Sequence, residues 1–202
     1  TLYGNLDAFK LLEEAVTHAG YNLGIDVFFS IDAAATHFKH GGAYKIKDRP
    51  VSMTANDLID FYINIIDQYH LLLIEDPLGE DDWDDWQNIY TKMGSKVLIV
   101  GDDLITTNLE RLQKAISSKA CNSIIVKPNH VGTISETIEV IRFAKSYGFK
   151  IVVSNRSGET NDDFIADFYG GVGADYVKFG APARGERVAK YNRLLEIEHE
   201  LS

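Results

Sequence analysis

The sequence contains a single cysteine, Cys121, among its 202 residues. One thiol cannot form an internal disulfide, so a reducing compartment is favoured. The sequence also lacks any apolar run approaching the roughly 18 residues that a membrane-spanning helix needs. Its start has no basic segment followed by an apolar stretch, which a secretory signal would show. We therefore expect a cytoplasmic protein without a membrane span.

Positive charge is also scarce. The chain has 20 Lys and Arg against 30 Asp and Glu, a net charge of −10. This balance argues against a nucleic-acid partner or an anionic membrane surface, although a few cations in a pocket could still bind a small anion. Linkers and low-complexity segments are absent as well, so we expect one domain over residues 1–202.

Short apolar runs recur along the chain, and they contain many Val and Ile residues. They show little alternation of polar and apolar residues, as expected of strands that are buried on both faces of a parallel sheet. These predicted strands are VFFSI (27–31), LLLI (71–74), VLIV (97–100), SIIV (123–126), KIVV (150–153) and YVK (176–178).

Helical patterns lie between most of these runs. Thr54 and Thr133 are predicted N-caps, each with an acidic residue three positions later, and Gly148 is a predicted helix stop. Residues 2–19 predict a helix before the first strand. The last helix is predicted over about 184–200, with Val188, Tyr191, Leu194 and Leu195 facing inward. Residues 37–50 are polar and predict a small hairpin that turns at Gly41-Gly42.

The alternation of strands and helices predicts an α/β fold with right-handed crossovers. We count six strand–helix units. A closed (β/α)₈ barrel has eight units and typically about 250 residues. The chain is therefore two units short of a barrel, or it forms an open doubly wound sheet.

Each predicted strand ends in polar or charged residues. The carboxyl ends of parallel strands meet at one rim, where the chemistry of such folds collects. A single Asp or Lys at a strand end is usually only a polar boundary, but six successive strands ending in this way indicate a site. The residues are Asp32, Glu75-Asp76, Asp102-Asp103, Lys127, Asn155-Arg156-Ser157 and Lys178.

The residue types at this rim predict three kinds of chemistry. Carboxylates from three successive strands suit a hard divalent cation and point to Mg²⁺. A lysine at such a rim can act as a base, because partial desolvation and neighbouring cations favour the neutral amine. Arg156, Ser157 and the loop amides could hold a phosphate.

Beyond these patterns, the sequence resembles the enolases, the phosphopyruvate hydratases of glycolysis. The resemblance covers nearly the whole chain from about residue 20, and the motifs KPN (127–129) and GAPARGERVAKYN (180–192) look closer to archaeal than to bacterial members. The matching stretches are SIDAAATHF (30–38), IEDPLGEDDW (74–83), VGDDLITTN (100–108), VKPNHVGTISET (126–137), VVSNRSGETNDDFIAD (152–167), KFGAPARGERVAKYN (178–192) and LLEIEHEL (194–201).

The resemblance implies a TIM-type (β/α) barrel of the enolase superfamily. Six β/α units correspond to its last part, so the barrel would be incomplete, without the N-terminal α+β domain and the first barrel elements. The implied Mg²⁺ ligands are Asp32, Glu75 and Asp102, and the last two also belong to the substrate-binding set. Lys127 matches the base that removes the proton next to the substrate carboxylate, and Lys178 binds near that carboxylate.

The implied reaction is the reversible dehydration of 2-phosphoglycerate to phosphoenolpyruvate, with Arg156 and Ser157 on the phosphate. Asn155 stands where most enolases have His; it can donate a hydrogen bond but cannot carry a proton. The family's general acid is a Glu upstream of the matched region, so we expect this lyase chain alone to show little turnover. The full-length protein is expected to be a homo-oligomer, a dimer or larger.

The sequence is also compatible with two other functions. The chain could be a catalytically inactive enolase-like binding or structural module, because it lacks the general acid. It could also remove a proton next to a different carboxylate, as enzymes that racemise or dehydrate other acids do. Arg156 and Ser157 weigh against the latter, since a phosphate site indicates a phosphorylated substrate.

Overall fold

The structure is a computed structural model that describes residues 4–202, and it divides into two compact units. The first unit extends to Leu104 and includes Ser117–Cys121. The second comprises Ile105–Ile116 and Asn122–Ser202. Among the described helices, none is both long enough and apolar enough to cross a membrane. The prediction of one domain over residues 1–202 is not tested by this division and stays a prediction.

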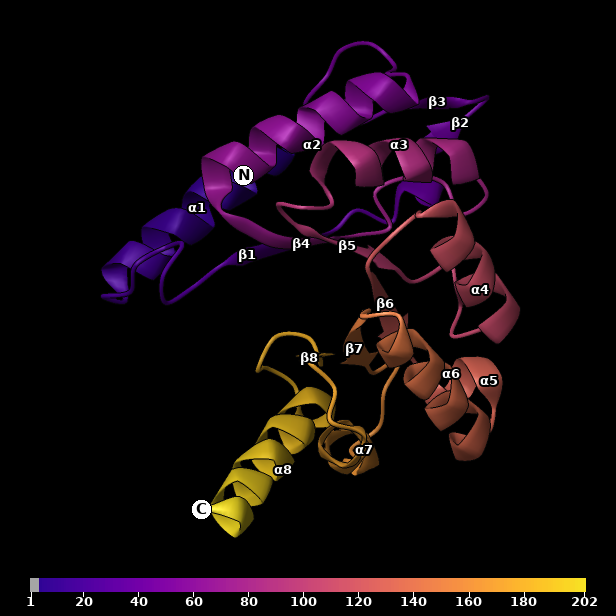
Figure 1. Cartoon of the computed structure of the whole chain (residues 1–202). Coiled ribbons are helices and arrows are strands. Elements are labelled where there is room, and N and C mark those ends of the chain that lie inside the picture. Colours follow the sequence, from indigo (N-terminus) through magenta and orange to yellow (C-terminus); the bar gives the residue numbers. More distant parts are fainter. Residues whose placement is uncertain (1–3) are drawn as a thin grey trace. The chain divides into compact units, whose positions relative to one another are not determined.

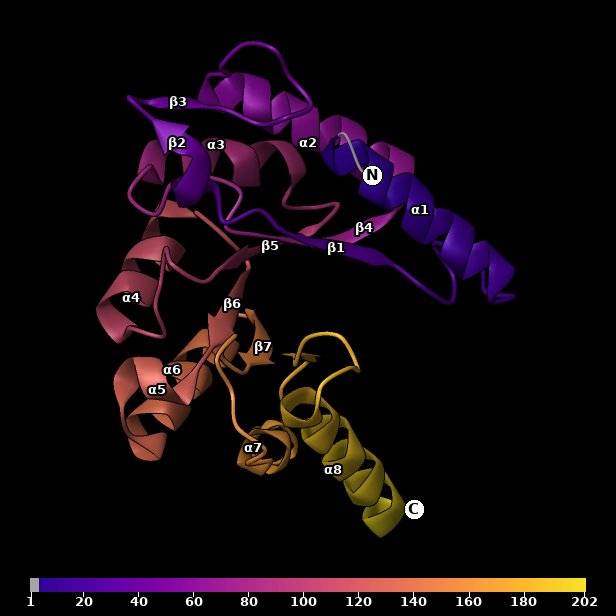
Figure 2. The same ribbon diagram turned by 180° about the vertical axis from the view of Figure 1, so that it is seen from behind.

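The first unit contains three parallel strands in the order β1-β4-β5, with the helices α1, α2 and α3 on the same face of these strands (Figures 1 and 2). All three strands were predicted, with ends shifted by one or two residues. The predicted helix over 2–19 is α1, and its first two residues lie outside the described residues. The bounds are α1 Asn5–His18, β1 Phe29–Asp32, α2 Ala55–Tyr69, β4 Leu71–Glu75, α3 Trp83–Met93 and β5 Leu98–Gly101.

A small hairpin follows β1, as the sequence predicts. It is formed by β2 (Lys39–His40) and β3 (Ala43–Tyr44), after the 3-10 helix η1 (Ala35–Phe38). Gly41 and Gly42 make the turn with φ of 56° and 82°, a left-handed conformation that glycine adopts without steric cost. The hydroxyl of the buried Tyr44 donates to Asp82 Oδ2 at 2.6 Å and accepts from the amide of Gly79 at 3.0 Å. The hairpin thereby supports the loop that follows β4.

The second unit has the same plan, with parallel strands in the order β6-β7-β8. The four residues of β6 are all buried, as a continuous apolar run predicts. Helices α7 and α8 lie side by side (Figure 2). The short helix α5 was not predicted. The bounds are β6 Ser123–Val126, α5 Pro128–Val131, α6 Ile134–Ser146, β7 Lys150–Ser154, α7 Phe164–Val172, β8 Tyr176–Lys178 and α8 Gly185–Leu201, and α4 (Leu109–Ser118) follows β5 in the chain.

The predicted helix caps are confirmed. Thr54 Oγ1 accepts from the amide of Asp57 at 3.2 Å, and the Asp57 carboxylate accepts from the amide of Thr54 at 2.9 Å. Thr133 Oγ1 likewise accepts from the amide of Glu136 at 3.3 Å. Gly148, two residues after α6, has φ of 77°. The threonine caps accept hydrogen bonds from free amides at the helix N-termini, and Gly148 allows the chain to turn away after α6. These features explain why the helices begin and end where the sequence predicts.

The predicted inward face of α8 is wrong at two positions. Leu195 is 63% exposed, although the pattern places it inside. Lys190, which the pattern leaves among the outward charges, has no exposed surface at all. The helix therefore directs Lys190 toward the interior of its unit, where this side chain has polar partners.

Candidate metal- and substrate-binding site

Two of the predicted metal ligands lie side by side in the first unit. Asp32 ends β1 and Glu75 ends β4, and their Cα atoms are partners in the parallel pairing of these strands. Residues paired in this way direct their side chains to the same face of a sheet. Glu75 is buried, with 2% of its surface exposed, and Asp32 is exposed. The pairing therefore places one buried and one accessible carboxylate at the carboxyl ends of neighbouring strands.

Asp102, the third predicted ligand, lies just beyond β5. Glu75 pairs with Val100, so Asp102 is two residues past the level of Glu75. The strand ends at Gly101, so Asp102 lies in the bend that directly follows it. Asp102 is also buried, with 8% of its surface exposed.

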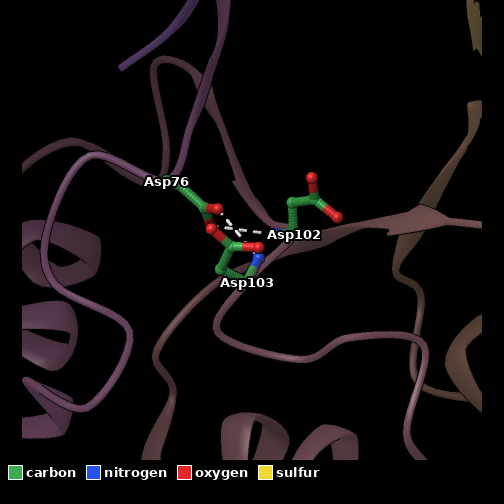
Figure 3. A group of neighbouring side chains, drawn as sticks. All are labelled: Asp76, Asp102 and Asp103. Carbon is green, nitrogen blue, oxygen red and sulfur yellow. Dashed lines mark hydrogen bonds between the residues drawn. The ribbon is translucent and has the colours of Figure 1, made fainter. Parts of the chain in front are cut away.

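Asp76 holds the backbone that carries Asp102. Its Oδ1 accepts from the amide of Asp102 at 2.9 Å, and its Oδ2 accepts from the amide of Asp103 at 2.8 Å. Figure 3 shows this clamp, with the Asp102 side chain directed away from the Asp76 carboxylate. Asp76 has φ of 42°, a left-handed conformation that is uncommon outside glycine and that turns the chain out of β4. Asp76 therefore positions Asp102.

Burial raises the pKa of Asp76 to about 7. The two amide hydrogen bonds oppose this shift, and the negative charges of Asp102 and Asp103 add to it. Among residues 4–202, Asp76, Asp102 and Asp103 form the one group of acidic side chains whose ligand atoms all lie within 4.8 Å of one another. These three carboxylates could hold a metal ion, and the group shares only Asp102 with the predicted triad.

The residues present fit a hard divalent cation. Both groups offer carboxylate oxygens without nitrogen or sulfur ligands, which is the chemistry that Mg²⁺ and Ca²⁺ prefer. Glu75, Asp76 and Asp102 are all buried. Burying several acids together is costly unless protons, hydrogen-bond donors or a cation offset their charge. The oxygens of Asp76 are already engaged by two amides, whereas Asp32 is open to solvent.

The two predicted lysines lie at the same level of the second unit: Lys178 ends β8, and Lys127 directly follows β6. Ser154 pairs with Lys178, and Val126, the residue before Lys127, pairs with Val153, the residue before Ser154. Lys127, Ser154 and Lys178 therefore follow one another across the carboxyl ends of β6, β7 and β8. Ser154 Oγ donates to the carbonyl of Lys178 at 3.3 Å, which ties these strand ends together.

The loop after β7 carries the predicted phosphate-binding residues. The backbone amide of Asn155 donates a hydrogen bond to the carbonyl of Lys178 at 3.3 Å. Arg156 and Ser157 are exposed, and within residues 4–202 their side chains make no hydrogen bond or ion pair with the protein. Asn155 and Arg156 also line a cavity of about 320 Å³ together with Pro128 and Asn129, which follow Lys127. Both loops thus border one hollow in the second unit.

Sequence reasoning missed the residues that hold these side chains in place. Thr107, which is buried, accepts a hydrogen bond from the amide of Lys127 at 3.1 Å. The sequence places Asp76 at the predicted rim without giving it a role, and it places Lys190 among the outward charges of the last helix. Two successive predicted strands are each followed by a pair of acidic residues, Glu75-Asp76 and Asp102-Asp103. This repetition is the sequence signal for the acidic cluster.

The comparison with protein families decides the class. Residues 1–202 match the family described as "Enolase, C-terminal TIM barrel domain". The chain belongs to this family. The match confirms the predicted resemblance and the TIM-barrel fold class, and the alternating strands and helices of both units agree with it.

Individual relatives give the same answer. The chain is 48% identical over 200 residues to the enolase of Beutenbergia cavernae, and 46% identical over 200 residues to the enolase of Rubrobacter xylanophilus. Each alignment covers 99% of this chain and 46% of the relative. The chain thus spans slightly less than half the length of these relatives.

Proposed function

We propose that this enolase-family chain carries the metal-binding, proton-removing and phosphate-binding residues of a phosphopyruvate hydratase. The reaction is the reversible dehydration of 2-phosphoglycerate to phosphoenolpyruvate. The observation that most supports it is the matched level of Lys127, Ser154 and Lys178 at three neighbouring strand ends. The loop with Arg156 and Ser157 follows directly. We also propose that residues 1–202 form part of one enolase barrel domain.

The metal in this proposal is Mg²⁺, held by Asp32, Glu75 and Asp102. When bound, it supplies positive charge that stabilises a substrate carboxylate as that group gains a second negative charge. The paired strand ends of Asp32 and Glu75 support this set. The alternative set of Asp76, Asp102 and Asp103 is less suitable, because the Asp76 oxygens already accept two backbone amides.

The chemical step in this proposal begins at Lys127. Its neutral amine takes the proton from carbon 2 of 2-phosphoglycerate, and the electron pair of that bond moves onto the carboxylate. The ammonium of Lys178 stabilises the added charge. Arg156 and Ser157 hold the phosphate, and Asn155 donates to a substrate oxygen. The electrons then form the C2–C3 double bond as hydroxide leaves carbon 3, a departure that needs a proton donor.

The first step can be tested separately from the second. The chain is incubated with 2-phosphoglycerate and Mg²⁺ in heavy water, and NMR follows loss of the signal of the carbon-2 proton. We expect slow exchange, and we expect Lys127→Ala to reduce its rate about 100-fold or more, the usual size of a general-base contribution. Lys10→Ala, at an exposed position of α1, is the matched control and should exchange at the unchanged rate.

Equal exchange rates in Lys127→Ala and the unsubstituted chain would remove Lys127 from its role. A parallel assay follows phosphoenolpyruvate by its absorbance and reports the complete reaction. We expect the rate of phosphoenolpyruvate formation by this chain to be low or zero. The cytoplasmic location and the homo-oligomer stay predictions that such assays do not address.

A further inference from the structure

A buried ammonium group lies behind the phosphate-binding loop. Lys190, on α8, has no exposed surface. Its Nζ donates to the carbonyl of Thr160 at 2.7 Å and lies 3.1 Å from Glu159 Oε2. Both partners belong to the loop that follows β7, so α8 is joined to this loop through a charge that has been removed from water.

The carboxylate of Glu159 continues this connection to the proposed phosphate ligands. Its second oxygen, Oε1, accepts a hydrogen bond from the backbone amide of Arg156 at 2.8 Å. Glu159 therefore bridges the Lys190 ammonium and the turn of Arg156 and Ser157. The side chain of Glu159 is 22% exposed, whereas that of Lys190 is fully enclosed.

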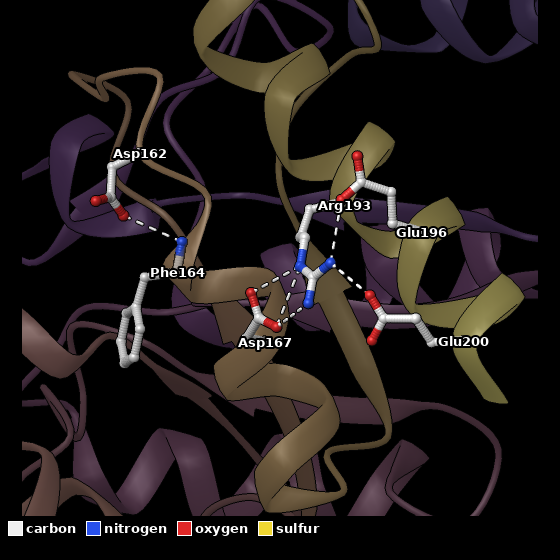
Figure 4. Close-up of polar contacts among 6 residues, drawn as sticks. All are labelled: Asp162, Phe164, Asp167, Arg193, Glu196 and Glu200. Atoms are coloured by element: carbon white, nitrogen blue, oxygen red, sulfur yellow. Dashed lines mark hydrogen bonds and ion pairs between the residues drawn. The ribbon is translucent and has the colours of Figure 1, made fainter.

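A second polar contact of α8 is made by Arg193 and leads to α7 rather than to the loop. Arg193, on the same helix, makes paired hydrogen bonds to Asp167 of α7, at 3.0 Å from Nε and 2.7 Å from Nη2 (Figure 4). Its Nη1 also contacts Glu196 and Glu200 at 3.0 Å. Arg193 thus fastens α8 to α7, and both polar contacts of the Lys190 side chain go to the loop.

Burying an ammonium is costly unless paired groups offset the lost hydration. A carboxylate beside an anion site is also unfavourable, since it repels the anion. Lys190 and Glu159 offset each other: the lysine neutralises the carboxylate, and the carboxylate orders the turn. A turn that is ordered before the ligand arrives binds more tightly, because less conformational entropy is lost on binding.

We propose that Lys190 and Glu159 are a positioning pair for phosphate binding by Arg156 and Ser157. Glu159 fixes the backbone of the turn, and Lys190 cancels the charge that Glu159 would otherwise direct at the phosphate. This inference rests on the proposed function, because it takes the turn as the phosphate site. It adds one requirement: Glu159 favours phosphate binding only while the Lys190 side chain is paired with it.

The test uses five forms of the chain: unsubstituted, Lys190→Met, Glu159→Gln, the double variant and Arg193→Met. Methionine keeps the apolar stem of lysine without the charge. Arg193→Met is the matched control, since it removes a cation from the same helix without touching the loop. The probes are 2-phosphoglycerate and inorganic phosphate, titrated against the NMR signals of the Arg156 and Ser157 amides.

We expect Lys190→Met to weaken both probes about tenfold, because the turn loosens and the Glu159 charge is exposed to the anion. Glu159→Gln should weaken them less. The double variant should bind more tightly than Lys190→Met alone, which a purely structural role for Lys190 does not predict. Arg193→Met should bind like the unsubstituted chain.

Equal affinity in Lys190→Met and the unsubstituted chain overturns the inference, and so does a double variant weaker than Lys190→Met. Absence of any amide shift with millimolar phosphate also overturns it. Should Lys190→Met not fold, Glu159→Met, which has no oxygen to accept the Arg156 amide, decides the matter: hydrogen exchange of that amide should become faster, and unchanged exchange contradicts the pair. Carbon-2 exchange that survives in Lys127→Ala, with the affinities as expected, overturns only the proposed function.

Discussion

The hydroxyl of Thr107 accepts a hydrogen bond from the backbone amide of Lys127 at 3.1 Å. Thr107 is fully buried and has φ of 52°, which is strained for a β-branched residue. A loop residue in an unfavourable conformation thus fixes the backbone of the proposed base. Strain of this kind persists only where the surrounding structure enforces it.

Thr107→Val should lower the free energy of unfolding by about 1–3 kcal/mol, because it leaves the Lys127 amide without its acceptor. Valine has the same shape and the same strain at positive φ, so the loss reports the hydroxyl alone. Thr106→Val is a matched control, since Thr106 has the same φ of 52° and donates to the carbonyl of Ile105. Urea unfolding measures stability, and carbon-2 exchange should slow only in Thr107→Val. Equal exchange in both variants would separate Thr107 from the base.

The carboxylate of Asp48 caps α1 from a distant loop. It accepts from the amide of Asn5 at 3.0 Å, from Asn5 Nδ2 at 2.7 Å and from the amide of Leu6 at 3.1 Å. Partial burial acts to raise the pKa of Asp48, but these hydrogen bonds outweigh it and hold the pKa below its ordinary value. Asp48→Ala should cost about 1 kcal/mol of stability, and Asp48→Asn less.

Thermal unfolding measures this cost, with Lys47→Ala at the exposed neighbouring position as control. Gly4→Ala provides an independent check. A Cβ at Gly4 would lie 2.4 Å from Asp48 Oδ1, so the added methyl must displace the capping carboxylate. We expect Gly4→Ala to destabilise the wild-type chain but to cost little more in the Asp48→Ala background. Additive losses would show that the two residues act independently.

Acid should weaken the contact between β7 and β8. Asp175 accepts from Lys150 Nζ at 2.6 Å and from the amide of Ile151 at 2.9 Å. Burial opposes ionisation, but these partners prevail and lower the pKa of Asp175 from 3.8. Because the folded-state value is the lower one, the contribution is complete above the unfolded pKa and is lost as pH falls through the folded pKa. The difference in unfolding free energy between the wild-type chain and Asp175→Asn should shrink below about pH 4. A difference independent of pH would contradict this.

Local rules were enough to predict most elements of the fold. Thr54 and Thr133 cap helices through hydrogen bonds that span three residues, and Gly41-Gly42 makes a turn that few other residues could make. The β6 strand follows from its apolar run. These features depend on neighbours in the sequence, so a pattern contains them.

The support of the candidate site depends on partners far along the chain. The buried Lys190 contacts Glu159 and Thr160, which lie about 30 residues earlier in the chain. The periodicity of the helix sequence cannot reveal such distant partners. Asp76 accepts hydrogen bonds from the amides of Asp102 and Asp103, which lie 26 and 27 residues later in the chain. Sequence patterns identified the residues proposed to contact the substrate, and the structure adds the residues that hold them.

Asp32, Glu75 and Asp102 are proposed to hold the Mg²⁺ ion, and a metal titration of four proteins tests this assignment most directly. Thermal or urea unfolding with and without Mg²⁺ is compared for the unsubstituted chain, Asp102→Asn, Asp32→Asn and Asp103→Asn. A ligand at 100 times its dissociation constant stabilises the folded state by about 2.7 kcal/mol. We expect this gain in the unsubstituted chain and in Asp103→Asn, and we expect it to be lost in Asp32→Asn and Asp102→Asn. A gain that survives Asp32→Asn and disappears in Asp103→Asn would contradict the claim and assign the ion to Asp76, Asp102 and Asp103.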